Sequence, residues 1–597
     1  MIDNEAFRKN IACNPLTDSI VVQAGPGSGK TALLVERLKY IIKHNTNPLS
    51  NVACITYTNA AKDEIIMRLQ NEKQQLPSEL FIGTIHSFLL DFVIKPYSHF
   101  ARKDNQSYKL APLGFARGYK REIGQMLNRP IHFINENILR AFESLGHDEQ
   151  GRPCCYANKI PSEIALQWKQ LIRGKGYIDQ QDVIHLSYLI LNKNKHICNA
   201  LSARFPYILV DEYQDVTFYQ EKVFSLLENS SFFCVGDTNQ SIYSFTGAKP
   251  EIFQAKWEHK EYKSYTLSNN FRSTAHIVKF ANHKTEITQA EAGPNGSIDQ
   301  KVLFVKNITE VSDVIQFFQR ICVKIDCENQ YKPYMILARQ NNYVKQLAHF
   351  FKKQEGELNS FLKKLREEHY RRFQILNNLL LAISYKRRNE VDKAVERMAE
   401  AFSYLFFNEH PNYVALAEIQ YDAFMWKKMH IFTLHFLDSL ILTETSVEVM
   451  FQKLKEFISD TSKKLYGKPV GKKLLMLNYS WKGQVKASKS TMLSELIEQI
   501  DSQVDFSENE DYVMNIHSAK GQEAECVLVM AESESQLLDW LKDNLDSEEA
   551  RVGYVAFSRA RKLLCVWAPT IQEDKFTHLQ QHIMFVDETY ATQTEKV

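Results

Sequence analysis

The sequence has no long apolar run and no segment that marks an exported protein. Nowhere in its 597 residues is there a stretch that approaches the roughly twenty apolar residues of a membrane span. The first ten residues, MIDNEAFRKN, have no apolar core of the kind that a signal peptide needs. These absences argue against a membrane protein or a secreted protein, and they predict a cytoplasmic location.

Cysteine is sparse and has no metal-binding spacing. The ten cysteines do not form the two close pairs that a zinc site uses. Cys154 and Cys155 are adjacent, whereas Cys322 and Cys327 each stand alone. We expect all of these thiols to be reduced in a cytoplasmic protein. The chain also has no internal repeat, low-complexity tract or long linker, so we expect several packed domains rather than a repeat array.

Net charge is nearly absent, at +2 overall, and therefore neither favours nor excludes a nucleic-acid partner. Acids are missing locally, however: residues 461–490 contain eight lysines and no Asp or Glu. Tyr466, Tyr479 and Trp481 are interleaved with these lysines. The stretch, which we call the basic stretch, fits either a surface that contacts nucleic-acid phosphates or a solvated loop.

A glycine-rich turn stands between an apolar run and a helical pattern. Residues 20–22 are apolar, and leucine and isoleucine recur at helical spacing over 33–42. A strand, a glycine-rich turn and a helix are the context of a phosphate-binding loop, which this context favours over a plain surface turn. Lys30 would reach the β- and γ-phosphates of a nucleotide, and the Thr31 hydroxyl would hold Mg²⁺. The expected nucleotide-binding residues are Ala24, Gly25, Pro26, Gly27, Ser28, Gly29, Lys30 and Thr31.

Apolar runs and helical patterns alternate along much of the chain, as they do in α/β proteins with parallel sheets. Buried-type strands are expected at residues 51–56, 207–210 and 232–235 of a first half. Another run, residues 263–267, is expected to open a second half. Two long helical patterns interrupt this rhythm, so the sequence predicts two parallel-sheet domains that each carry a mainly helical insertion.

Two acids and an amide follow the predicted strands, where ligands of parallel sheets bind. Asp211 is placed to hold Mg²⁺ through water, and Glu212 to orient or deprotonate an attacking water. Gln240 lies in a polar turn after the next strand, where it would sense the γ-phosphate; a purely structural turn is the alternative. The combination of this acid pair with a phosphate loop is what points to nucleotide hydrolysis.

Arg272 and Arg559 each lie beside a predicted helix start. Phosphoryl transfer spreads negative charge over the γ-phosphate oxygens, and a guanidinium group can neutralise that charge through two parallel hydrogen bonds. Taken singly, either arginine would more simply be a surface salt-bridge partner.

Eight stretches then occur in a fixed order along the chain. They are AGPGSGKT, TYTNAA, GTIHSF, LVDEYQD, VGDTNQSIY, NFRST, HSAKGQE and YVAFSRA. Together they resemble the superfamily 1 DNA helicases of the UvrD/Rep/PcrA kind over nearly the whole chain. The resemblance implies two RecA-like motor domains, 1A and 2A, with insertions 1B and 2B. The implied boundaries are residues 1–90 and 191–260 for 1A, 91–190 for 1B, 261–345 and 508–597 for 2A, and 346–507 for 2B.

The resemblance also implies the chemistry. ATP, with Mg²⁺ on Thr31 and Asp211, would lie between the motors, and single-stranded DNA would cross both with 3′-to-5′ polarity. The implied catalytic residues are Lys30, Asp211, Glu212, Gln240, Arg272 and Arg559, with Gly521 and Glu523 also at the nucleotide. The implied DNA-contact residues are Tyr57, Thr58, Asn59, His86, Tyr243, Phe245 and His517, several of which have aromatic faces on which bases can stack.

Three features depart from that family. The stretch from Asn4 to Asn14 lacks the usual adenine-reading glutamine, which puts adenine specificity in question. Phe245 and Thr246 replace the usual tryptophan–arginine pair, which removes a cation from the DNA track. The 2B insertion is short, so translocation is better supported than strand separation.

The chain ends soon after Trp567, so we expect any nuclease to be a separate chain. Compact UvrD-like helicases also occur in two-gene phage-defence systems such as Gabija, beside an OLD-family nuclease, and analogy suggests that setting here. A second hypothesis is therefore a nucleotide-gated regulatory subunit of a nuclease complex with little unwinding of its own. A third, a metabolic P-loop kinase, is opposed by the second sheet domain and by the basic stretch.

Overall fold

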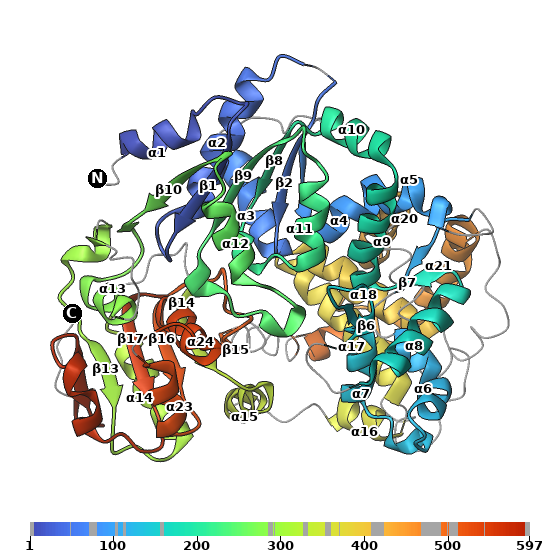
Figure 1. Ribbon diagram of the computed structural model, residues 1–597. Coiled ribbons are helices and arrows are strands. Elements are labelled where there is room, and N and C mark those ends of the chain that lie inside the picture. The colour runs from blue at the N-terminus through green and yellow to red at the C-terminus, as the bar shows by residue number, and fades with distance from the viewer. Residues whose placement is uncertain are drawn as a thin grey trace. The chain divides into compact units, whose positions relative to one another are not determined.

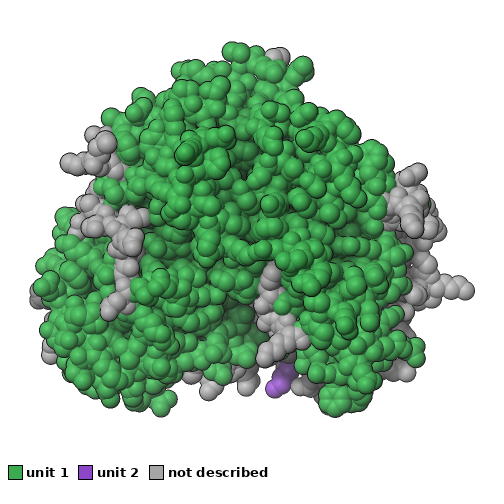
Figure 2. Space-filling model, in the orientation of Figure 1, with its two compact units in different colours: residues 1–110, 121–347, 512–597 green, residues 111–120, 348–511 purple. Residues whose placement is uncertain are grey.

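The computed structural model describes residues 5–47, 49–70, 80–101, 106–111, 115–155, 160–283, 290–291, 293–325, 332–352, 360–368, 370–406, 423–466, 491–497, 500, 512–542 and 544–590. The chain divides into two compact units, coloured separately in Figure 2. Unit 1 comprises residues 1–110, 121–347 and 512–597, and unit 2 comprises residues 111–120 and 348–511. Among the described residues, no helix combines the length and the apolar character that crossing a bilayer would require.

Unit 1 contains a first parallel sheet of six strands, whose order is β10-β1-β9-β8-β2-β3 (Figure 1). Its strands alternate their side chains between two cores, because successive residues of a strand point to opposite faces. Val21 packs on one side, for example, while Ile20 and Val22 pack on the other. The strands are β1 (Ser19–Ala24), β2 (Val52–Thr56), β3 (Leu80–Thr84), β8 (Tyr207–Val210), β9 (Ser231–Gly236) and β10 (Tyr262–Leu267).

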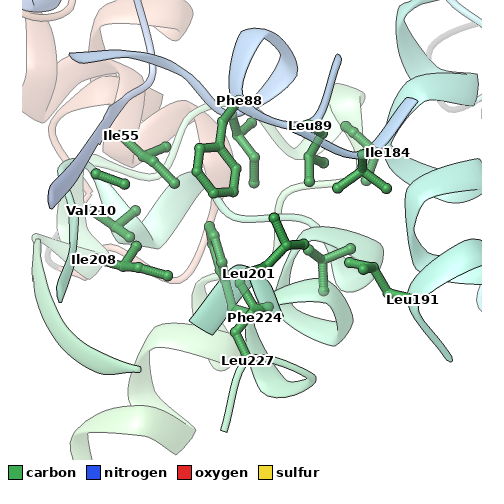
Figure 3. Close-up of a cluster of buried hydrophobic side chains, with 14 of the residues drawn as sticks. Ile55, Phe88, Leu89, Ile184, Leu191, Leu201, Ile208, Val210, Phe224 and Leu227 are labelled. Carbon is green, nitrogen blue, oxygen red and sulfur yellow. The ribbon is translucent and has the colours of Figure 1, made fainter. Parts of the chain in front are cut away.

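Helices cover both faces of this sheet, so its strands are nearly continuous apolar runs. Leu33, Leu34 and Leu38 lie in the core on one face. Figure 3 shows the other core, in which Phe88, Leu201 and Phe224 gather around the strand residues Ile55 and Val210. The first face is covered by α1 (Glu5–Ala12), α2 (Lys30–His44) and α3 (Asn59–Gln70), and the second by α4 (Ile85–Leu89), α9 (Gln180–Lys193), α10 (Lys195–Arg204), α11 (Phe218–Ser225) and α12 (Pro250–Trp257).

A second parallel six-stranded sheet in unit 1 has the order β15-β14-β16-β17-β13-β18. Its core contains Trp540 and Phe557, both fully buried. The strands are β13 (Val302–Val305), β14 (Lys332–Ala338), β15 (Val513–Asn515), β16 (Ala524–Met530), β17 (Ala560–Trp567) and β18 (Ile583–Val586). The packed helices are α13 (Ala275–Asn282), α14 (Val311–Cys322), α23 (Glu534–Trp540) and α24 (Glu548–Phe557). The chain therefore has two α/β domains with parallel sheets, as its sequence predicts.

One strand expectation is wrong. We expected residues 263–267 to open the second half, but β10 pairs in parallel with β1 at the edge of the first sheet. An edge strand needs only one neighbour, and the alternation of its side chains is the same whichever sheet it joins. The chain enters the second sheet later, through β13.

The region between β3 and β8 is mainly helical, as expected. Besides α4, α9 and α10, its described part contains a five-residue π-helix at Leu90–Ile94 and several 3₁₀ turns. The remaining α-helices are α5 (Lys95–Tyr97), α6 (Lys120–Met126), α7 (Glu136–Glu143) and α8 (Ser162–Gly174), and the two-residue strands are β4 (Lys109–Leu110), β5 (Gly146–His147), β6 (Pro153–Cys154) and β7 (Tyr177–Ile178).

Unit 2 is helical in its described part and has its own apolar core, which includes Leu376, Leu379 and Leu380. A tight turn at Asn389, with φ of 65°, joins α17 to α18. The described helices are α16 (Ser360–Glu368), α17 (Tyr370–Arg387), α18 (Val391–Phe406), α20 (Ala423–Asp438) and α21 (Val447–Tyr466), and α15 (Asn341–Lys352) precedes them. The side chains of the basic stretch, residues 461–490, lie outside the described residues.

Candidate nucleotide and DNA site

The glycine-rich loop joins β1 to α2. Gly27 and Gly29 have φ values of 70° and 78°, a region that side chains with a Cβ rarely adopt. A Cβ on Gly27 would lie 2.5 Å from Asn270 Oδ1, and one on Gly29 would lie 2.7 Å from Arg8 Nη2. The loop is therefore closely packed, and only glycine fits at these two positions.

Arg8 of α1 holds the loop from the side. Its guanidinium group donates to the carbonyl oxygens of Ser28 and Gly29, the latter at 2.9 Å. Phe271 lies under the same group, with the Arg8 Cζ 5.5 Å from the ring centroid. Arg8 therefore fixes the carbonyl oxygens of the loop, which lies at the N-terminus of α2, where an anion is favoured.

Lys30, Asp211 and Glu212 form a charged group at the base of the site. Lys30 Nζ is buried without a hydrogen bond and lies 3.8 Å from Glu212 Oε1. Burial raises the pKa of Glu212, but Lys30 and other neighbouring cations outweigh it and lower that pKa to about 2. Burial and the Glu212 charge raise the pKa of Asp211 to about 7. Lys30 therefore compensates Asp211 only in part, and Lys30 Nζ has no hydrogen-bond acceptor among the described residues.

Gln240 connects the two sheets. It belongs to the turn after β9, where its Nε2 donates to Asp237 Oδ2 at 2.7 Å. Its Oε1 accepts from Arg559 Nη2, of the second sheet domain, at 3.2 Å. Burial, and then the nearby Arg272, lower the pKa of Arg559 to about 10. Arg559 is thus a fully enclosed cation whose contact crosses from one sheet domain to the other.

Helix boundaries correct our placement of the two arginines. Ser547 caps the start of α24, because its Oγ accepts from Ala550 N at 3.1 Å, and Arg559 follows the end of that helix rather than its start. Arg272 precedes α13. Arg272 Nη1 donates to the Ser558 carbonyl oxygen at 3.2 Å, and its Nε pairs with Glu523.

A cavity of about 700 Å³ brings these groups together. Its volume lies in the range of pockets that hold small ligands and cofactors. All of the loop residues from Gly25 to Thr31 line it, together with Glu212, Gln240, Arg272, Arg559, Gly521 and Glu523. Of the predicted nucleotide residues, Ala24 and Asp211 do not line it; both are buried, Ala24 as the last residue of β1 and Asp211 just after β8.

An aromatic cluster lies at the predicted DNA track. Tyr57 and Tyr243 stack with centroids 4.9 Å apart, and the Tyr243 hydroxyl donates to the His517 carbonyl oxygen at 3.0 Å. Phe245, which is 42% exposed, lies 5.4 Å from the His517 ring. The cluster therefore joins both sheet domains and leaves one aromatic ring accessible.

The other predicted DNA residues lie apart from that cluster's contacts. Thr58 Oγ1 accepts from Ala61 N at 3.2 Å, which makes it part of the turn into α3. Burial lowers the pKa of His86 to about 4, and its Nε2 has no hydrogen-bond partner in the described part of the chain. Asn59 begins α3, but its side chain lies outside the described residues.

Several cavity residues were not predicted from the sequence. Arg561 and Lys332 of the second sheet and Glu64 and Arg68 of α3 also line the cavity. Lys332 Nζ donates to Gln522 Oε1 at 3.0 Å, and Arg561 pairs with Glu523. Arg561 directly follows the YVAFSRA stretch, two residues after Arg559, and lies outside every stretch that carries the resemblance.

Comparison with known proteins places these features in a family. Residues 4–261 match the UvrD/REP helicase N-terminal domain, and residues 512–567 match the UvrD-like helicase C-terminal domain.

Some relatives match over nearly the whole chain and others over less than half of it. An ATP-dependent DNA helicase Rep of Buchnera aphidicola subsp. Schizaphis graminum is 24% identical, covering 98% of this chain and 94% of the relative. An ATP-dependent DNA helicase PcrA of Staphylococcus epidermidis is 22% identical, covering 95% of this chain and 83% of the relative. The Rep helicase of Escherichia coli is 28% identical over 45% of this chain and 41% of its own length. With its two parallel sheets and the cavity between their loops, the chain belongs to the UvrD/Rep family of superfamily 1 DNA helicases, whose members are DNA-dependent ATPases.

Proposed function

We propose that the protein is an ATP-driven motor that moves 3′ to 5′ along single-stranded DNA and separates a duplex ahead of it. The observation that carries this proposal is the convergence of Lys30 and Glu212 with Arg272 and Arg559 on one cavity. The first pair comes from one sheet domain and the second pair from the other. A cavity built from two domains changes shape when its ligand is cleaved, and such a change can move the domains along a bound strand.

The residues present fit a magnesium–nucleotide complex. Lys30 has a buried ammonium group that lacks an acceptor, and glycine-rich backbone leaves N–H groups for phosphate oxygens. Asp211, whose pKa is raised to about 7, would regain its charge beside a divalent cation. Thr31 and Asp211 would hold that cation, which neutralises phosphate charge when it is bound.

Each cavity residue then has a role. Glu212, ionised at neutral pH, orients and deprotonates the attacking water. Arg272 and Arg559 neutralise the charge that spreads over the γ-phosphate oxygens in the transition state. Gln240, which contacts Arg559, reports the state of the γ-phosphate to both sheets. Tyr57, Tyr243, Phe245 and His517 provide faces on which bases stack irrespective of sequence, whereas Thr58, Asn59 and His86 are DNA contacts by resemblance alone.

The experiment measures ATP hydrolysis with and without single-stranded DNA, and unwinding of duplexes with a 3′ or a 5′ tail. We expect DNA to stimulate hydrolysis and the 3′-tailed duplex to be unwound, and Lys30→Ala to abolish both. An ATPase rate that does not change when DNA is added would contradict the proposal of a DNA motor. Unwinding of the 5′-tailed duplex alone would show the opposite polarity.

A regulatory subunit of a nuclease complex is the second candidate, favoured by Thr246, which stands where the family has an arginine, and by the short helical unit. The OLD-family nuclease partner and the Gabija-type phage-defence setting stay predictions that rest on resemblance alone. Co-purification with a nuclease from the native host, together with absent unwinding by the isolated chain, would favour this candidate. Unwinding by the chain alone would count against it.

A further inference from the structure

Arg561 is a cavity arginine to which the mechanism above gives no role. It lies on β17, two residues after Arg559, and its side chain is only 7% exposed. Arg561 Nη1 lies 3.1 Å from Glu523 Oε1, and Nε lies 3.4 Å from Oε1 of Glu525, a fully buried carboxylate. Arg561 therefore forms ion pairs with two carboxylates at once, Glu525 through Nε and Glu523 through Nη1.

Glu523 is shared by two arginines. One of its oxygens pairs with Arg561 Nη1, and the other pairs with Arg272 Nε. Burial raises the pKa of Glu523, but Arg272, Arg561 and Arg559 outweigh it, so that the pKa lies below its usual value. Glu523 is thus a charged carboxylate, and it holds one of the arginines that the γ-phosphate requires.

The contact between Glu523 and Arg272 competes with catalysis. Arg272 must turn its guanidinium group toward phosphate oxygens, and doing so withdraws a cation from Glu523. A partly buried carboxylate that loses an ion-paired cation is destabilised, and less so when a second ion-paired cation remains. Arg561 supplies this second cation, because Glu525 holds it in place whether or not Arg272 has moved.

We propose that Arg561 is a positioning residue that retains Glu523 and thereby frees Arg272 for the terminal phosphate of a nucleoside triphosphate. Without Arg561, Arg272 is the remaining ion-pair partner of Glu523 in the described contacts, and the stronger hold of Glu523 keeps Arg272 away from the phosphate. This inference rests on the proposed ATPase function, but it adds a residue to which that function does not assign a role.

The test compares Arg561→Met, Glu523→Gln and the double variant. Arg561→Met should lower the DNA-stimulated kcat about tenfold, since a hydrogen bond to a charged group is worth about 1.5 kcal/mol or more. In the double variant the neutral amide no longer restrains Arg272, so kcat should return to within about threefold of Glu523→Gln alone. Recovery by a second substitution is a result that a merely structural role for Arg561 would not give.

A binding measurement keeps the inference testable without turnover. The affinity for a non-hydrolysable ATP analogue, relative to ADP, should fall about threefold in Arg561→Met and recover in the double variant, because only the triphosphate meets Arg272. A wild type without ATPase would defeat the proposed function, yet this ratio would still decide the role of Arg561.

Lys562→Met is the matched control, because the contact described for Lys562 Nζ is with Glu525 Oε2, at 3.5 Å. It should keep the wild-type kcat. If Arg561→Met does not fold, Arg561→Lys is used instead. Lysine retains the positive charge, but it lacks the planar guanidinium group that contacts two carboxylates at once. It should show a smaller loss that Glu523→Gln likewise relieves. Wild-type kcat in Arg561→Met, or losses that simply multiply in the double variant, would overturn the inference.

Discussion

At the scale of single residues, Glu212 has the backbone that most needs explanation. Its φ of 51° lies in the left-handed region, which a residue with a Cβ adopts at a cost of about 1 kcal/mol or more. The conformation lets Asp211 Oδ1 accept from Glu212 N at 3.0 Å, while Gln214 Nε2 donates to the Glu212 carboxylate. Strain of this kind persists where surrounding contacts over-determine it, and such sites are often functional.

Glu212→Gln tests whether this carboxylate is the base. The amide keeps the side chain's size but cannot take a proton from water, so kcat should fall about 100-fold or more. Binding of a non-hydrolysable ATP analogue should stay within about threefold of wild type, because Lys30 and the loop remain. Single-turnover hydrolysis and equilibrium binding measure the two effects. Unchanged turnover would show that another group activates the water.

Site residues that directly follow a predicted strand could be predicted from the sequence. Lys30, Asp211 and Glu212 follow strands that any reading of the apolar pattern finds, and parallel strands bring their ends to one edge. Arg8 and Arg561 could not be predicted in this way. Arg8 reaches the loop from a helix that ends before β1, and only the packing of α1 reveals that contact.

At the scale of elements, α8 and α9 share a buried charge network. Lys169 Nζ lies 2.5 Å from Asp179 Oδ2, and Arg173 Nη2 lies 2.5 Å from Asp182 Oδ1. Asp179 and Asp182 also form the capping box that begins α9. The same two acids therefore fix both the start of the helix and its partner.

Two histidines stack against this network, with ring centroids 4.0 Å apart. Burial, and then Lys169, lower the pKa of His147 from 6.5 to about 2. Burial, and then Arg173, lower that of His185 from 6.5 to about 4. Both are therefore neutral in the folded protein, whereas the unfolded chain takes up protons below pH 6.5.

Acid should therefore weaken these helices. Because the folded pKa values are depressed, the stabilisation is present above pH 6.5 and is lost as the pH falls toward 4 and then 2. When the pH falls from 7.5 to 5.5, each histidine should lower the free energy needed to open these helices by about 1 kcal/mol. Asp179, whose pKa burial raises to about 6, acts in the opposite direction, so the comparison must be between variants.

The measurement is peptide-level hydrogen exchange over 162–193, corrected for the intrinsic effect of pH on exchange. When the pH falls from 7.5 to 5.5, the opening free energy should decrease by about 1 kcal/mol less in His185→Gln than in wild type. His196→Gln, at a histidine of α10 outside this network, is the control and should follow wild type. Equal acid sensitivity in His185→Gln would show that His185 does not titrate on opening.

At the scale of the whole motor, β10 shows what periodicity leaves undecided. The alternation of its side chains predicts a strand but not the sheet that the strand joins, and the pairing with β1 depends on contacts between residues more than 200 positions apart in the sequence. The presence of two sheets was predictable, because apolar runs and helical patterns repeat on both sides of the insertion. The cross-domain contacts were not, because each depends on how the two sheets pack.

Lys520 contacts both Gln240, which lines the nucleotide cavity, and Tyr243 of the aromatic cluster. Its Nζ lies 2.5 Å from Asp215 Oδ2 and 2.5 Å from the Gln240 carbonyl oxygen. The same ammonium group lies 5.0 Å from the Tyr243 ring centroid. A DNA strand that displaces Tyr243 would therefore also shift the Lys520 ammonium group, which contacts Gln240. This contact is a physical route from bound DNA to the residue proposed to sense the γ-phosphate.

Removing this contact should uncouple hydrolysis from DNA. We combine Lys520→Met with Asp215→Asn, because Lys520→Met alone would strand the buried Asp215 carboxylate. The double variant should still bind the ATP analogue, but the factor by which DNA stimulates its ATPase should fall about tenfold, equivalent to a coupling free energy of about 1.4 kcal/mol. Arg551→Met is the matched control, since Arg551 Nε donates across the same interface to the Ser241 carbonyl oxygen at 2.7 Å without meeting Tyr243 or Asp215 in the described contacts. If both variants lose stimulation equally, general loosening of the interface is the cause; if neither does, DNA reaches the cavity by another route.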